Sequence, residues 1–171
     1  MPGIREWGFR WRRHVRKIVD SKYPGVRVVN AQFGWFSTWD FLVRKKRRVR
    51  QWTDVYTREL AWSLQQPGVR MAVLAHSYGT YAVCQAMQHY RDIRVDRLYL
   101  AGCVLDNEFK WSQIDNPDRD QIGFVWNACA KWDFWVGLGS AGLRRFYPDL
   151  GSAGFDGFIH PPQHFEQPEL P

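Results

Sequence analysis

The chain has 171 residues, of which 45% are hydrophobic and 16% aromatic, which fits one domain over residues 1–171 with an ordinary core and excludes a largely disordered protein. Its formal net charge is +7, with 24 Lys and Arg residues against 17 Asp and Glu residues. The positive charge is concentrated in two basic clusters: Arg12, Arg13, Arg16 and Lys17, and the run 44–50. Such clusters either attract nucleic acid, anionic lipid or acidic substrates, or are simply solvated surfaces.

The first third of the chain alternates helical and strand patterns. From Trp7 to Lys22, apolar residues recur at helical spacing between arginines, which predicts an amphipathic helix. The segment Val26 to Phe33 is rich in β-branched residues and predicts a strand that leads into an aromatic loop. A second helix is predicted from about Arg50 to Gln65, with one apolar face and a stop at Pro67-Gly68.

The rest of the assigned pattern is that of an α/β protein. Met71–Ala75 is a short, continuous apolar run, typical of a strand buried on both faces of a parallel sheet. A helical stripe follows, and further strands are predicted over Val95–Val104 and Phe124–Ala130, with a loop or short helix between them. This order predicts a mainly parallel sheet flanked by helices. The segment from Leu143 onward has no clear assignment.

Between the predicted strand and helix lies the sequence AHSYG, centred on Ser77. A serine at a sharp strand-to-helix turn exposes its hydroxyl, and small residues two before and two after it, here Ala75 and Gly79, let the turn close. The following helix directs its N-terminal amides toward the reaction centre, so the amide of Tyr78 is a candidate oxyanion donor. The alternative is an ordinary serine that caps its helix.

This turn resembles the nucleophile elbow of the α/β-hydrolase superfamily, usually written GxSxG, with Ala in place of the first Gly. The resemblance implies Ser77 as the nucleophile, followed along the chain by an acid and then a histidine. It places the acid at Asp133, just after the second strand beyond the turn. Asp106, just after the first such strand, is the alternative acid that some members of the superfamily use.

The same chain order leaves two residues, His160 and His164, as candidates for the base. We favour His164, because Pro161 follows His160 and restricts its backbone, and His160 remains the alternative. His76 is excluded because it is the immediate neighbour of Ser77.

The resemblance covers roughly residues 3–133 and departs from the superfamily pattern at both ends. Gly3-Ile4-Arg5 is similar to the tail of an HGIR-type loop, which makes the amide of Ile4 a candidate second oxyanion donor, but the strand that should precede it is missing. No clear strand delivers the histidine at the C-terminal end. A truncated or degenerate hydrolase is therefore an open alternative.

The predicted reaction is hydrolysis of a carboxylic ester or a related small acyl substrate, without cofactor or metal. The connection between Val104 and Phe124 is too short for a lid domain, so an open site is expected. An aromatic cluster could line an acyl pocket or belong to the core: Trp35, Phe36, Trp39 and Phe41.

The second hypothesis is a noncatalytic scaffold that binds nucleic acid, anionic membrane or a protein partner through its basic faces. For the hydrolase, no nucleic acid is obligatory, and no sequence feature sets the oligomeric state. The three cysteines, Cys84, Cys103 and Cys129, have no metal-binding spacing. Because no apolar run is long enough to span a membrane either, a cytoplasmic protein is expected.

Overall fold

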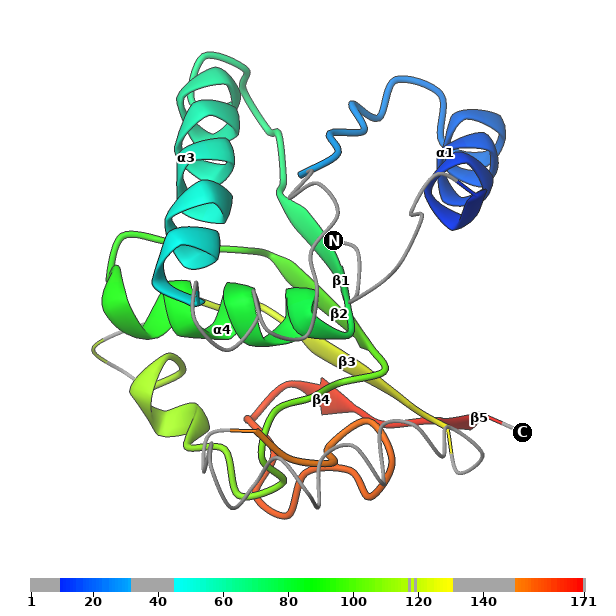
Figure 1. The fold of residues 1–171 in the computed structure, drawn as a ribbon. Coiled ribbons are helices and arrows are strands. Elements are labelled where there is room, and N and C mark those ends of the chain that lie inside the picture. The colour runs from blue at the N-terminus through cyan, green and yellow to red at the C-terminus, as the bar shows by residue number, and fades with distance from the viewer. Residues whose placement is uncertain (1–9, 32–44, 117, 119, 131–149, 171) are drawn as a thin grey trace.

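The helices and strands follow one another in an α/β order. The computed structural model describes residues 10–31, 45–116, 118, 120–130 and 150–170. Its elements, drawn in Figure 1, are α1 (Arg10–Lys22), α3 (Lys45–Ser63), β1 (Ala72–His76), α4 (Tyr78–His89), β2 (Arg97–Ala101), the short 3-10 helix η1 (Trp111–Gln113), β3 (Val125–Ala130), β4 (Phe165–Glu166) and β5 (Glu169–Leu170). The predicted alternation of helices and strands is confirmed for residues 45–130.

All the strands are parallel, in the order β1-β2-β3-β4, and β5 pairs with β3 as well. Val125 pairs with Phe165 and Cys129 with Glu169, so β4 and β5 follow β3 in a single register. Pro168 separates them because it has no N–H to donate, yet its carbonyl accepts a hydrogen bond from the Cys129 N–H at 3.2 Å. Neither strand is predicted from the sequence pattern, because each is only two residues long.

Helices α3 and α4 pack against each other on the same side of the sheet (Figure 1). The segment after Ser77 forms a helix that can lie close to the sheet because small residues, Gly79, Ala82 and Ala86, are buried along it. Val83 and Met87 complete the buried face and are fully excluded from solvent. None of the helices that the structure describes is long and apolar enough to cross a bilayer.

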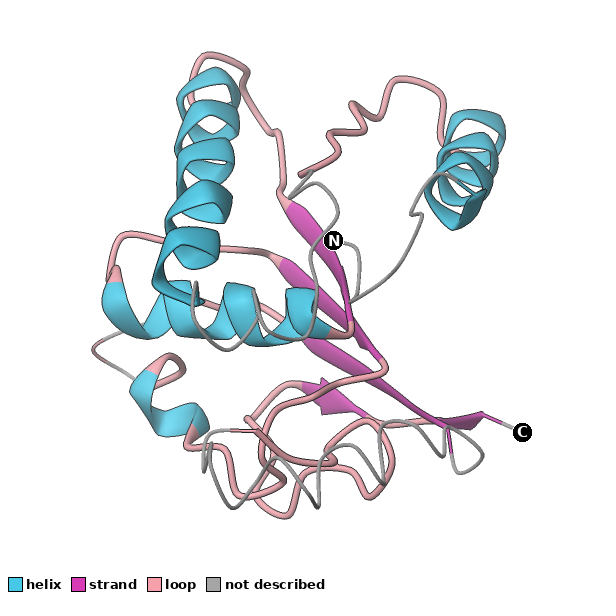
Figure 2. Ribbon diagram, viewed as in Figure 1, coloured by secondary structure: helices cyan, strands magenta, loops and turns pink. Residues whose placement is uncertain are grey.

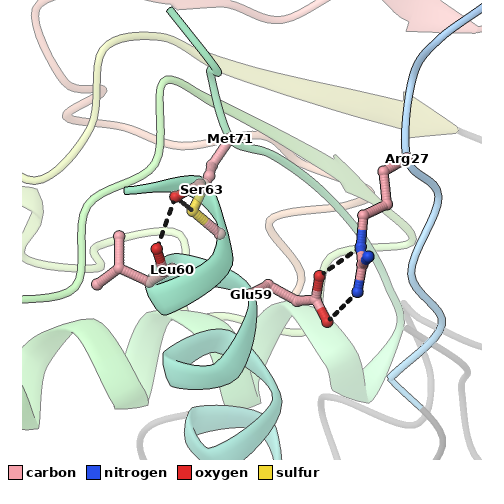
Figure 3. A network of polar contacts seen from close by, with 5 residues as sticks. All are labelled: Arg27, Glu59, Leu60, Ser63 and Met71. Carbon is pink, nitrogen blue, oxygen red and sulfur yellow. Dashed lines mark hydrogen bonds and ion pairs between the residues drawn. The ribbon is translucent and has the colours of Figure 1, made fainter. Parts of the chain in front are cut away.

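The strand predicted at Val26 to Phe33 is not found in its described part. Residues 26–31 have no regular structure (Figure 2), while 32 and 33 lie outside the described residues. A β-branched composition shows only that a segment fits a strand, and a strand also needs a neighbouring ladder. Here side chains hold the segment: Arg27 donates to the Glu59 carboxylate at 3.0 Å (Figure 3). The Arg27 guanidinium also lies over the ring of Trp62.

Strand β1 also differs from its prediction as a strand buried on both faces. Ala75 is fully buried on the side of α3 and α4, whereas Ala72 is exposed and Leu74 keeps 38% of its surface in solvent. Among the described strands, β1 has a neighbour on one side only, β2. A continuous apolar run therefore indicated the strand correctly and its burial incorrectly.

Candidate functional site

Ser77 occupies the turn that joins β1 to α4, and its backbone is unusual. Its φ of 51° and ψ of −125° make it the one non-glycine residue with positive φ among those described. A serine that caps a helix normally has β-region dihedrals and bonds to the N–H of the second or third helical residue. The Ser77 side chain makes no such capping bond, so the ordinary cap is not what the structure shows.

Hydrogen bonds fix the peptide groups on both sides of Ser77. Its N–H donates to the carbonyl of Ala101, at the end of β2, at 2.9 Å. Its own carbonyl accepts from the N–H of Thr80 at 2.9 Å. Backbone conformations of this kind cost of order 1–3 kcal/mol and persist only where the surroundings impose them, which these bonds do. The Ser77 residue is partly exposed rather than buried.

The helix that follows begins at Tyr78, which is fully buried. The first N–H groups of a helix have no carbonyl partner within that helix and carry the positive end of its dipole. The predicted oxyanion donor, the amide of Tyr78, belongs to this first turn of α4. The second predicted donor, the amide of Ile4, lies outside the described residues.

The alternative acid, Asp106, lies in the loop after β2, at the same edge of the sheet as Ser77. One of its carboxylate oxygens accepts a hydrogen bond from the N–H of Glu108 at 2.8 Å, and its carbonyl accepts from the N–H of Phe109 at 3.1 Å. These bonds hold the Asp106 side chain in a local turn. The favoured acid, Asp133, lies outside the described residues, as does the aromatic cluster 35–41.

Two loops interlock at this carboxyl edge, residues 102–107 and 150–159. Three N–H groups of the second loop donate to carbonyls of the first: Gly151 to Val104 at 3.0 Å, Ala153 to Leu105 at 3.1 Å and Gly154 to Cys103 at 2.8 Å. The contact is so close that a Cβ on Gly154 would lie 2.2 Å from the nitrogen of Cys103. The position of one loop therefore fixes that of the other.

The segment that carries the alternative base, His160, is joined to the loop after β2. The N–H of Ile159 donates to the carbonyl of Asn107 at 2.9 Å, so the residues next to His160 and Asp106 are hydrogen-bonded to each other. The side chain of His160 is exposed.

The favoured base, His164, lies at the opposite edge. Its carbonyl accepts from the N–H of Val125, and the next residue, Phe165, begins β4. Because β4 is parallel to β1, a residue just before β4 lies at the amino edge, while Ser77 follows the carboxyl end of β1. Strand rise and strand spacing separate the two backbones by about 16 Å along the strands and about 14 Å across them. The structure does not bring His164 to Ser77.

Apolar side chains and an ion pair enclose a hollow of about 650 Å³ beside the amino half of β1. Its walls come from α1, residues 25–31, α3 and residues 69–74, and Ser77 is not among them. This hollow is therefore no part of the site at the turn.

Cys84 and Cys103 add no second reactive group. Burial raises the pKa of Cys84 well above its ordinary value and raises the pKa of Cys103 to about 12. Thiols with such pKa values are not ionised at neutral pH and are poor nucleophiles. The described residues also hold no group of three or more His, Cys, Asp or Glu side chains that could bind a metal.

Comparison with known protein families, curated proteins and solved structures gives no match. The features that bear on function are therefore the backbone at Ser77, the start of α4 and the two hydrogen-bonded loops.

Proposed function

We propose that this protein is a serine hydrolase of the α/β-hydrolase type that acts on a carboxylic ester or a related acyl substrate, with Ser77 as its nucleophile. The observation that carries the proposal is the positive φ of Ser77 at a strand-to-helix turn, without a capping bond from its side chain. A helix cap does not require this conformation, whereas a serine that must present its hydroxyl above a sheet edge does. The parallel order β1-β2-β3 supports the same superfamily.

In the proposed reaction, the Ser77 hydroxyl attacks the substrate carbonyl and transfers its proton to a histidine, while the amide of Tyr78 binds the oxyanion. The histidine then protonates the leaving alcohol, and water hydrolyses the acyl-enzyme by the same route in reverse. His160 takes the role of base in this proposal, since the residue before it, Ile159, is hydrogen-bonded to Asn107, next to Asp106. Asp106 and Asp133 remain the two candidates for the acid.

A fluorophosphonate probe tests the nucleophile directly, because it reacts with serines activated by a neighbouring base. We expect the probe to label the wild-type protein and Ser77→Ala to abolish that labelling. Ser63→Ala is the matched control, since Ser63 is a partly buried serine whose hydroxyl bonds to the Leu60 carbonyl at 2.8 Å, far from the turn. Equal labelling of wild type and Ser77→Ala, or none in either, would reject the proposal.

The noncatalytic scaffold is the second candidate, favoured by the exposed basic side chains of α1: Arg13, Arg16 and Lys17. The scaffold hypothesis predicts that Ser77 does not react with the probe. It also requires binding to an anionic partner that weakens steeply as salt is raised. The probe experiment therefore separates the two candidates.

A further inference from the structure

Thr80 connects the candidate nucleophile to the neighbouring loop. It lies in the first turn of α4, three residues after Ser77, and is fully buried. Its hydroxyl donates to the carbonyl of Ser77 at 2.6 Å and accepts a hydrogen bond from the N–H of Val104 at 3.2 Å. One side chain thus bridges the turn after β1 and the loop after β2.

Only part of this arrangement follows from helix geometry. Threonine hydroxyls commonly bond to a carbonyl three or four residues earlier in a helix, which accounts for the bond to Ser77. The bond from Val104 is between segments 24 residues apart, and the helix itself does not need it. Because Thr80 has no exposed surface, no solvent is at hand to replace either bond if the hydroxyl is removed.

We infer that Thr80 is a positioning residue for the nucleophile, an inference that rests on the proposed function. Its hydroxyl and its N–H both bind the Ser77 carbonyl, so Thr80 sets the orientation of the peptide group after Ser77. Through Val104 the same hydroxyl fixes the loop 102–107, which carries Asp106 and is hydrogen-bonded to the loop 150–159. The direction of the Ser77 hydroxyl and the place of both loops therefore depend on one buried side chain.

Removal of the hydroxyl should slow attack by Ser77 and leave proton transfer unchanged. Small displacements of a reacting group cost large factors in rate, about 10²-fold for a shift of about 1 Å. Thr80 has no part in the transfer of the proton itself. The pH at which reactivity reaches half its plateau should stay the same while the plateau falls.

The test measures the second-order rate constant for fluorophosphonate labelling across pH, on full-length protein shown to be folded by circular dichroism. We expect Thr80→Val to lower the plateau by about 10²-fold with an unchanged midpoint. Thr80→Ser, which keeps the hydroxyl, should stay within a few-fold of wild type. The control is Thr53→Val, which removes a comparable hydroxyl bond to a helix carbonyl, Val49, at 3.0 Å in α3, and should label at the wild-type rate.

The outcomes separate this inference from the proposed function. Absence of Ser77-dependent labelling in the wild type would overturn both. Normal labelling of wild type with an unchanged rate in Thr80→Val, or a shifted midpoint in that variant, would overturn the role of Thr80 alone. If Thr80→Val does not fold, Thr80→Cys replaces the hydroxyl by a thiol, a weaker hydrogen-bonding group, and should lower the plateau with an unchanged midpoint. If neither variant folds, Thr80 serves stability and the inference fails.

Discussion

The two edges of the same parallel sheet carry different parts of the candidate site. At the carboxyl edge, the turn at Ser77 and the loops 102–107 and 150–159 are joined by backbone hydrogen bonds and by Thr80. At the amino edge, the Asp96 carboxylate accepts a hydrogen bond from the Met71 N–H at 2.6 Å, and His164 is exposed. Reactive groups in α/β sheets gather beyond the carboxyl ends of the strands, where successive loops meet. A histidine at the amino edge therefore cannot act as the base for a serine at the carboxyl edge.

The largest expected effect is that of replacing His160, the histidine proposed as the base. We expect His160→Gln to lower the rate of fluorophosphonate labelling of Ser77 by about 10² to 10⁴-fold, the usual contribution of a general base. The matched variant His164→Gln removes an equally exposed imidazole from the amino edge and should label at the wild-type rate. Rate constants from gel-based labelling over time provide the measurement.

The reverse result would assign the role of base to His164. A loss with His164→Gln and none with His160→Gln would mean that the C-terminal strands do not run in the register seen here, because the parallel pairing of Phe165 with Val125 keeps His164 away from Ser77.

The next effect concerns the tight contact between the two carboxyl-edge loops. Gly154→Ala would place a Cβ 2.2 Å from the nitrogen of Cys103, so a backbone must move. We expect a loss of about 3 kcal/mol in the free energy of unfolding, the upper range for overpacking, together with slower labelling of Ser77. Gly68→Ala is the control, since Gly68 has a φ of +77° but open space around it and should lose only about 1 kcal/mol. Urea denaturation measures both, and equal losses would contradict the close contact.

The sequence predicted the elements around Ser77 well because their signals are local. The apolar run at Met71–Ala75 and the small residues of α4 give β1, the turn and the helix within a few residues of their observed bounds. The positive φ of Ser77 agrees with the expectation drawn from the AHSYG pattern.

The partners of Ser77 were harder to predict because they depend on strand direction and long-range pairing. No pattern marks β4 as a strand, so nothing in the sequence showed that His164 precedes it and lies at the amino edge. The restriction that Pro161 places on His160 affects its backbone but not the edge to which the chain brings it. The role of Thr80 was missed for the same reason: its position three residues after Ser77 is visible in the sequence, but its bond to Val104 is not.

The smallest expected effect lies far from the carboxyl edge, where Arg27 joins residues 26–31 to α3. Its guanidinium binds Glu59 and covers Trp62 at 4.6 Å from the ring centre. Exposed ion pairs and cation–π contacts each contribute up to about 1 kcal/mol, and Arg27 is half exposed, so Arg27→Ala should lower the free energy of unfolding by about 1 kcal/mol. Arg16→Ala is the control, because Arg16 pairs with Asp20 only within α1, at 3.5 Å and with both side chains more than half exposed.

Arg16→Ala should change stability by no more than about 0.5 kcal/mol. Urea denaturation checks both values, and labelling of Ser77 should stay at the wild-type rate in both variants, since neither arginine touches the turn, the loops after β2 or the loop 150–159. A large fall in labelling with Arg27→Ala would mean that the segment 26–31 supports the carboxyl edge, and the contrast between the two edges would then no longer hold.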